Sequence, residues 1–209
     1  MSDRYNATLN SEGQYQPGSN ERVLLNKLDV TDPDEMDNVE FDLLADLENQ
    51  LLNEIQMDSR IKVDDLCKWH TRWLGGVYEW AGRYRSVNLS KDDFHFAAAN
   101  QVLRLMDEYD RKYLSVYTPC EGMNNSELID ALSICHVEYI IIHPFREGNG
   151  RLARLFATVM ALQADVPPLN FEIMYTNKNG YISAIHAGHA GDYNPMRGFF
   201  ERILGFSKE

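Results

Sequence analysis

A glycine-rich stretch between two apolar, helix-like segments constrains this chain more than any other feature. We call it the motif loop, and it reads His143-Pro144-Phe145-Arg146-Glu147-Gly148-Asn149-Gly150-Arg151-Leu152-Ala153-Arg154. Apolar residues precede it at 137–142 and follow it at helical spacing. Pro144 disfavours helical geometry at the residue before it, and glycines allow backbone angles that other residues resist. The sequence therefore predicts a short loop between two helices, with the second beginning at about Arg151.

The side chains of the motif loop have the chemistry needed to handle a nucleoside triphosphate. His143 can take up a proton near neutral pH. Glu147 offers the hard oxygen ligand that Mg²⁺ uses when it also binds phosphates. Asn149 and the loop N–H groups can donate to phosphate oxygens, and Arg151 and Arg154 share one face of the first helical turn, where they can bind outer phosphates. The Gly-x-x-x-x-Gly-Lys-Ser/Thr pattern of a P-loop is absent from the sequence, so another kind of phosphate site is expected.

The pattern His-Pro-Phe-x-Glu-Gly-Asn-Gly-Arg-x-x-Arg resembles the signature of the Fic family of nucleotidyltransferases. Every specified position is filled, and the resemblance extends to residues 80–96 and to much of 15–205. It implies an all-α, mainly helical Fic fold with one short β-hairpin, the flap, at about 83–96. It also implies a single Fic domain over 23–209, after a polar N-terminal tail at 1–22.

The resemblance further implies transfer of AMP from MgATP to a hydroxyl side chain of a target protein, with release of pyrophosphate. His143 would be the general base, Glu147 would hold Mg²⁺, and Phe145 would anchor the loop in the core. The nucleotide would be bound by Gly148, Asn149, Gly150, Arg151, Arg154 and Tyr181. A core tyrosine is an equal interpretation of Tyr181. Relatives that transfer phosphate depart from Gly-Asn-Gly, which favours AMP here, although the choice of base lies outside the motif.

The segment from Gly82 to Phe96 changes to a two-residue period. One set of alternating residues is Tyr84, Ser86, Asn88 and Ser90, and the other is Arg85, Val87, Leu89 and Lys91. A turn at Lys91-Asp92-Asp93 then predicts a hairpin. In the Fic family the flap docks the target by adding a strand, which suits an edge with free N–H and C=O groups. The residues that would dock the target are Arg85, Ser86, Val87, Asn88 and Leu89. A plain surface hairpin is the alternative.

A second short pattern lies near the N-terminus. Residues 8–13, Thr-Leu-Asn-Ser-Glu-Gly, fit the Ser/Thr-x-x-x-Glu-Gly/Asn pattern that some Fic proteins carry on an inhibitory helix. There the glutamate pairs with the second motif arginine, so Glu12 would pair with Arg154. The surrounding residues are poor helix formers. Two readings stay open: self-inhibition by Glu12, or an ordered polar tail. In the second case the chain resembles toxin members that a separate small antitoxin inhibits.

Composition limits the other function classes. The chain has 209 residues, 25% of them charged and 44% hydrophobic, as expected of a soluble globular domain. A net charge of −12 argues against non-specific binding to nucleic acid or anionic membranes. The first thirty residues lack a signal-like apolar segment, and the three cysteines show no paired spacing. A cytoplasmic protein is expected, with delivery into a host cell left open.

Two other functions compete with AMP transfer. A non-catalytic Fic-fold binding module would not need His143 and Glu147, and a nucleotide hydrolase would not need a docking strand. Outside the motif loop, His70 and His136 are interpreted as structural histidines. The expected helices span about 31–55, 63–74, 97–117, 127–142, 151–164, 177–189 and 191–204.

Overall fold

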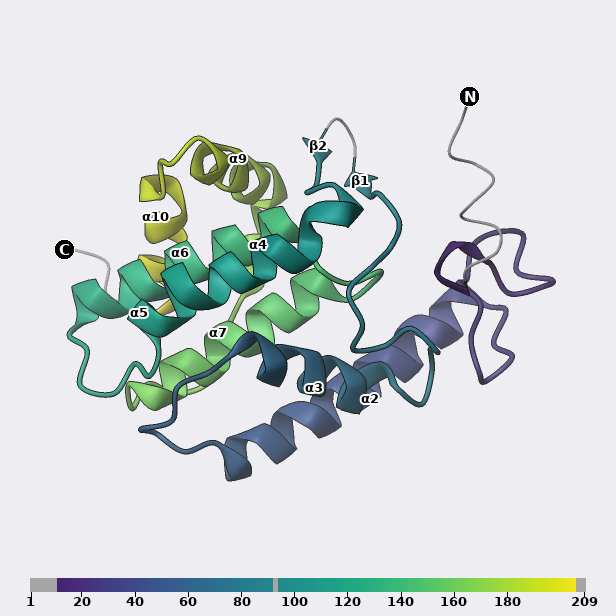
Figure 1. The fold of residues 1–209 in the computed structure, drawn as a ribbon. Helices are drawn as coiled ribbons and strands as arrows, with labels where there is room; N and C mark the ends of the chain where they lie inside the picture. Colours follow the sequence, from purple (N-terminus) through teal and green to yellow (C-terminus); the bar gives the residue numbers. More distant parts are fainter. Residues whose placement is uncertain (1–10, 92–93, 206–209) are drawn as a thin grey trace.

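The computed structural model describes residues 11–91 and 94–205, and within them the chain is mainly helical with one antiparallel hairpin (Figure 1). Helix α6 (Asn125–Ile142) lies at the centre and is apolar almost all round, as expected of a buried helix. Four helices pack around it: α4 (Val102–Tyr109), α7 (Asn149–Gln163), α9 (Lys178–His189) and α10 (Asn194–Ile203). The predicted all-α fold class with a short hairpin is therefore confirmed.

Helices α2 (Pro33–Glu54) and α3 (Val63–Leu74) pack against each other and against α7, and they form the lower part of the molecule in Figure 1. The Asp32 side chain caps α2 by accepting hydrogen bonds from the N–H groups of Asp34 and Glu35, both at 3.0 Å. Both helices begin and end within a few residues of the predicted positions. Trp73 on α3 and Glu40 on α2 become important at the site below.

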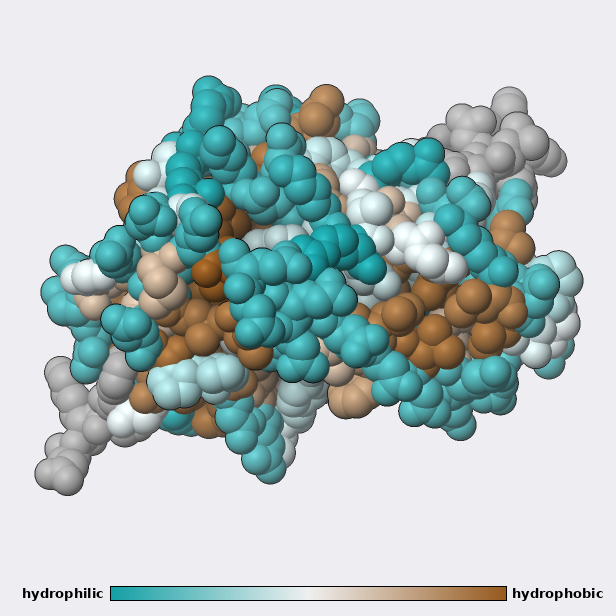
Figure 2. All heavy atoms as spheres, turned by 90° about the horizontal axis from the view of Figure 1, so that it is seen from below, coloured by the Kyte–Doolittle hydropathy of each residue, from teal (hydrophilic) through white to brown (hydrophobic). Residues whose placement is uncertain are grey.

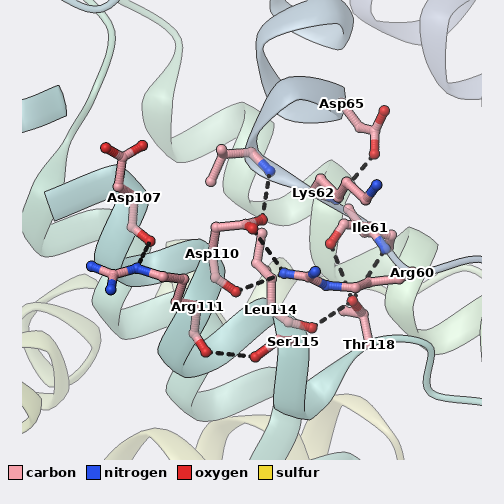
Figure 3. A network of polar contacts seen from close by, with 11 residues as sticks. Arg60, Ile61, Lys62, Asp65, Asp107, Asp110, Arg111, Leu114, Ser115 and Thr118 are labelled. Carbon is pink, nitrogen blue, oxygen red and sulfur yellow. Dashed lines mark hydrogen bonds and ion pairs between the residues drawn. The ribbon is translucent and has the colours of Figure 1, made fainter. Parts of the chain in front are cut away.

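The segment predicted as one helix over 97–117 is divided into four shorter helical segments of three types. A 3₁₀ turn (Ala99–Gln101) leads into α4, and a π turn (Asp110–Leu114) separates α4 from α5 (Ser115–Tyr117). Figure 3 shows why the π turn is stable: Arg60 donates to both the carboxylate and the carbonyl of Asp110, at 2.8 and 2.9 Å. The Thr118 hydroxyl oxygen also accepts a hydrogen bond from the N–H of Ile61 at 3.1 Å. These long-range contacts follow from no local pattern.

The flap hairpin is shorter than the alternating pattern predicts. Its strands are β1 (Ser90–Lys91) and β2 (Phe94–His95), with Ser90 opposite His95 and Lys91 opposite Phe94. Residues 84–89 lead up to β1 without strand structure. The predicted turn residues 92 and 93 lie outside the described residues. The hairpin stands beside α9 in Figure 1, where Phe94 stacks on His186.

The N-terminal segment packs on the molecule from residue 11 onward. It forms a single 3₁₀ turn (Ser11–Gly13) and an isolated bridge between Tyr15 and Leu24, and it buries Gln16 and Ser19. The predicted polar tail at 1–22 is therefore folded over its described part, whereas residues 8–10 of the inhibitory pattern lie outside the described residues.

Two further features complete the fold. A short helix, α8 (Glu172–Thr176), was not predicted because it is too short to show a period. On the face seen in Figure 2, hydrophobic patches are interspersed with hydrophilic residues. Within residues 11–91 and 94–205, every helix is too short or too polar to cross a membrane.

Candidate functional site

An open pocket of about 710 Å³ lies between the motif loop, the flap and the face formed by α8 and α9. Ile140 of α6 and His143, which caps the end of that helix, also line the pocket. The pocket contains most of the residues that the sequence assigns to the site: Leu89, His143, Glu147, Gly148, Asn149, Gly150, Arg151, Arg154 and Tyr181. The structure therefore brings together residues as far apart in the sequence as Leu89 and Tyr181.

His143 ends α6 in a left-handed conformation, with φ 53° and ψ 62°. Its ring stacks on Phe96 of the flap, with centroids 3.7 Å apart and planes 17° apart. Its Nδ1 lies 3.2 Å from the carbonyl oxygen of Ile140. Because a carbonyl oxygen only accepts, Nδ1 carries the proton of the neutral ring, and Nε2 is left able to accept one.

Burial, together with the nearby charges of Arg85 and Lys91, lowers the pKa of His143 to about 4, against a smaller opposing effect of the hydrogen bond to Ile140. The imidazole is therefore neutral at pH 7. A neutral imidazole with an unprotonated Nε2 has the protonation state that a general base requires.

Arg85 is buried, with 2% of its surface exposed, and its guanidinium donates only to main-chain oxygens in the contacts described. The acceptors are the carbonyl oxygens of Val87, Ala97, Ile142 and His143, at 2.5–3.2 Å. Its own N–H donates to the carbonyl of Pro144 at 2.8 Å. A guanidinium buried in this way ties the base of the flap to the motif loop, and the docking role of Arg85 stays a prediction.

The other predicted docking residues also contact their own chain. The N–H and hydroxyl of Ser86 donate to the Glu12 carboxylate, at 2.8 and 3.2 Å. The Asn88 side chain accepts the N–H of Ala99 at 2.9 Å. The Leu89 carbonyl accepts from Phe96 at 3.2 Å and so extends the hairpin by one pair. Of the flap residues 84–91, those that border the pocket are Leu89 and the two residues of β1.

Phe145 and Asn149 hold the motif loop in the core. Phe145 has no exposed surface and stacks on His70 at 4.0 Å. The Asn149 side chain bonds both main-chain groups of Phe145: its oxygen accepts the N–H at 2.9 Å, and its nitrogen donates to the carbonyl at 2.8 Å. The role of the Asn149 side-chain amide in phosphate binding stays a prediction. That amide is engaged within the loop, because α7 begins at Asn149 and turns the side chain inward.

Gly148 is the residue whose lack of a side chain matters most. Its φ is 81°, and an added Cβ would lie 2.6 Å from the ring of Trp73. It precedes α7 and offers no side-chain oxygen to cap the helix, so the first N–H groups of α7 face the loop. Gly150 lies within the first turn, where the helix begins two residues earlier than predicted, and its φ is not positive.

His70 joins the two walls of the pocket. Its Nδ1 accepts the N–H of Gly82 at 2.8 Å, and its Nε2 lies 3.1 Å from the carbonyl of Glu147. Burial lowers its pKa to about 4, so the ring is neutral, with the proton on Nε2. The interpretation of His70 as a structural histidine is confirmed.

His136 and Tyr181 form a buried pair beside the pocket. The Nε2 atom of His136 lies 2.8 Å from the Tyr181 hydroxyl, and burial lowers the pKa of His136 to about 3. Burial also raises the pKa of Tyr181 to about 12. Tyr181 thus borders the pocket and is held by the core, and its contact with a nucleotide stays a prediction.

The two motif arginines each lie over an aromatic ring. The Arg151 guanidinium is 4.8 Å from the Trp73 ring centroid, and that of Arg154 is 4.7 Å from the Tyr175 ring centroid. Arg151 also pairs with Glu40 at 2.5 Å and lies 3.5 Å from Glu147. Glu40 was missed by the sequence reasoning. Its signal is a carboxylate on the inward face of α2, in phase with the buried residues Met36, Leu47 and Leu51.

Glu147 is the carboxylate that is exposed on the pocket wall. One of its oxygens accepts the N–H of Gly148 at 2.8 Å. In the described ranges 11–91 and 94–205, we found no group of three or more acidic, histidine or cysteine side chains that could hold a metal. This arrangement fits Mg²⁺, which often takes one or two carboxylates from the protein and the rest of its ligands from phosphates and water.

Glu12 lies at the base of the flap rather than beside Arg154. It is buried, its carboxylate accepts from Ser86, and its carbonyl accepts from Arg146 Nε at 2.7 Å. Among the described residues, no ion pair joins Glu12 to Arg154, which lies over Tyr175 instead. The pairing expected for self-inhibition is thus replaced by contacts with the flap and the motif loop.

Comparison with known proteins gives a consistent family. A model of the Fic/DOC family matches residues 60–161. The chain is 29% identical over 149 residues to the protein adenylyltransferase Fic of Nematostella vectensis, covering 71% of this chain and 33% of that protein. It is 30% identical over 142 residues to the protein adenylyltransferase VbhT of Bartonella schoenbuchensis, covering 68% and 29%. This chain therefore spans about a third of the length of these relatives.

A solved structure shows the same fold over nearly the whole chain. The BepC protein of Bartonella tribocorum, crystallised with bound AMPPNP, superposes with a TM-score of 0.72 at 20% identity and covers 92% of this chain and 96% of its own. Together with the match over the motif loop, these similarities establish that the chain belongs to the Fic family.

Proposed function

We propose that this protein is a protein adenylyltransferase that transfers AMP from ATP to a hydroxyl side chain of a target protein. The observation that carries the proposal is the position of His143. Its ring is neutral, its Nε2 can accept a proton, and it borders a pocket whose walls carry Arg151, Arg154 and Glu147. The adenylyltransferase names of the two relatives support the same reaction.

In this reaction His143 Nε2 accepts the proton of the target hydroxyl. The hydroxyl oxygen forms a bond to the α-phosphorus, and the bond from that phosphorus to the bridging oxygen breaks, so that pyrophosphate leaves. Burial, together with the nearby cations Arg85 and Lys91, lowers the pKa of His143 and keeps the free imidazole neutral. A bound triphosphate brings negative charge into the pocket and so favours the protonated ring that forms during transfer.

The nucleotide lies with its phosphates at the first turn of α7. Gly148 lets them approach the main chain, Arg151 pairs with the β-phosphate, and Arg154 pairs with the γ-phosphate. The adenosine lies toward Tyr181 and the apolar residues Ile182 and Ile185 that line the same pocket. Glu147 would hold Mg²⁺, which neutralises phosphate charge when bound.

The target protein docks along the flap, through residues 89–91. Extended main chain of the target adds to this edge and brings its hydroxyl side chain toward His143. Arg85 plays no direct part in this docking, since its guanidinium is buried.

In this proposal a separate partner protein inhibits AMP transfer. The contacts of Glu12 lie at the flap base, so they do not block the site of the γ-phosphate at Arg154. A small antitoxin that supplies an inhibitory glutamate to Arg154 would fit this arrangement.

The test is incubation of the purified protein with Mg²⁺ and ATP labelled on the α-phosphate, in a bacterial lysate. The protein should label at least one target, which mass spectrometry identifies, and His143→Ala should lower labelling by about 10²–10⁴-fold. Free AMP without labelled protein would instead indicate a hydrolase. Nucleotide binding without either product would indicate a binding module.

A further inference from the structure

Helix α2 contributes a buried carboxylate that the proposed reaction does not use. Glu40 is 3% exposed and lies outside residues 60–161, the segment that the Fic/DOC family model matches. Its Oε1 accepts the hydroxyl of Tyr78 at 2.5 Å, and its Oε2 lies 2.5 Å from Nη2 of Arg151. A buried carboxylate is unfavourable unless it is paired, so the pairing partner indicates its purpose.

The partner, Arg151, is a residue of the motif loop that borders the pocket. Its guanidinium lies over Trp73, whose indole N–H donates to the Glu40 carbonyl at 2.8 Å. One guanidinium thus joins α2, α3 and α7. A guanidinium presents five N–H donors in a planar fork, and Glu40 engages its Nη2 end. The Arg151 side chain is 27% exposed and borders the pocket.

Glu147 competes for the same guanidinium. It lies four residues before Arg151 on the pocket side, at 3.5 Å from Nη2, and its side chain is more exposed than that of Glu40. Without Glu40, the nearest carboxylate for Arg151 would be Glu147. Arg151 would then turn toward the residue that the proposed function assigns to the metal ion.

We propose that Glu40 is a positioning residue that holds Arg151 against Trp73, ready for the β-phosphate, and keeps Glu147 free for the cation. This proposal rests on the proposed function, because it takes the ligand of the pocket to be a nucleoside triphosphate. It assigns to α2 a part in nucleotide recognition that lies outside the motif loop.

The test measures nucleotide binding in the full-length His143→Ala protein, which binds without turnover, by calorimetry with Mg²⁺. Glu40→Gln, placed in this background, keeps the size of the side chain and removes its charge. We expect ATP to bind about tenfold more weakly, the equivalent of one lost charge-assisted contact. AMP lacks the β-phosphate, so its affinity should stay the same.

Glu54→Gln is the matched control. Glu54 lies on the same helix and pairs with Arg72 at 2.7 Å, but this pair is partly exposed and outside the pocket. Its substitution should leave the affinities for ATP and AMP unchanged. Tyr78→Phe removes only the hydrogen bond from the Tyr78 hydroxyl to Glu40. It should therefore weaken ATP binding less than Glu40→Gln does and leave AMP binding unchanged. This variant replaces Glu40→Gln in the test if Glu40→Gln does not fold.

Arg151→Gln completes a double-mutant cycle. If Glu40 acts through Arg151, then Glu40→Gln should have no further effect on ATP affinity in the Arg151→Gln protein. Equal weakening of ATP and AMP, or a lower melting temperature without a selective loss for ATP, would overturn the proposal in favour of a structural role. Tighter ATP binding by Glu40→Gln would overturn it in favour of competition with phosphate. Failure of the His143→Ala protein itself to bind ATP would contradict the proposed function instead.

Discussion

The two walls of the pocket are held in place by different kinds of contact. The motif-loop wall is packed: Phe145 is fully buried, and Gly148 leaves no room for a methyl group beside Trp73. The flap wall has a hairpin of two residue pairs, and its base is held by polar contacts of Arg85 and Glu12. Close packing fixes positions more firmly than a few hydrogen bonds do. The difference suits a rigid wall for chemistry and a more adaptable wall for a target.

The largest effect is expected in the packed wall. Phe145→Ala should lower the free energy of unfolding by about 3–5 kcal/mol, because it removes a fully buried ring that stacks on His70. Urea unfolding measures this change. Phe41→Ala is the control: Phe41 is 68% exposed, and its loss should change stability by less than about 0.5 kcal/mol. Equal losses for the two variants would mean that the loop is not anchored by packing.

Arg85→Met tests the junction between the walls. The guanidinium donates to the carbonyl of His143 at 2.6 Å, so its loss should misplace the ring. We expect kcat to fall by about a hundredfold, the effect of a misplacement near 1 Å, and KM for the target to stay the same. Steady-state transfer assays on the labelled target separate the two constants. A rise in KM alone would restore the docking role that the sequence predicted for Arg85.

Acid should lower the free energy of unfolding, because three buried histidines are held neutral in the folded chain. Burial lowers the pKa of His70 and His143 to about 4 and that of His136 to about 3, whereas an unfolded histidine titrates near 6.5. Between these values the unfolded chain binds more protons than the folded chain. Stability should therefore be greatest above pH 6.5 and fall toward pH 4, by up to about 1.4 kcal/mol per pH unit for each histidine.

His70→Gln isolates one of these contributions. Glutamine can retain an acceptor for Gly82 and a donor for Glu147, but it does not titrate. Urea unfolding between pH 4 and pH 7 should give a shallower pH dependence for the variant. Parallel curves for variant and wild type would show that His70 is not buried as a neutral ring.

The smallest effect is expected at the edge of the flap wall. Glu12→Gly removes the carboxylate that accepts from the N–H and hydroxyl of Ser86 and should lower the transfer rate by about threefold, the scale of a typical net hydrogen-bond contribution. The same radiolabel assay measures it. A many-fold rise in activity would show that Glu12 is inhibitory and would remove the main reason to invoke a separate antitoxin.

The sequence predicted the packed wall better than the flap wall. The motif loop is a contiguous stretch in which Pro144 and Gly148 govern the backbone locally, so its shape and most of its chemistry could be inferred. The inward contacts of the Asn149 side chain could not be inferred, because α7 begins at Asn149, two residues before the predicted start.

The flap wall depends on contacts between distant parts of the chain. Alternation correctly indicated a hairpin, but its length is limited where Ser86 bonds Glu12, 74 residues away, and where Arg85 bonds His143, 58 residues away. The role of Glu40 is equally invisible to local pattern, because a carboxylate on a helix is usually a solvated one. The one local indication is that Glu40 lies on the same face of α2 as the buried apolar residues of that helix.

The stack of Phe96 on His143 has a consequence for spectroscopy. The rings lie 3.7 Å apart and nearly parallel, so the ring current of Phe96 should move the imidazole proton resonances upfield. Phe96 belongs to the flap and His143 to the motif loop, so displacement of the flap by a docked target would return those resonances toward their usual frequencies. The contact that orients the proposed general base thereby makes its own NMR signal a gauge of the distance between the two walls.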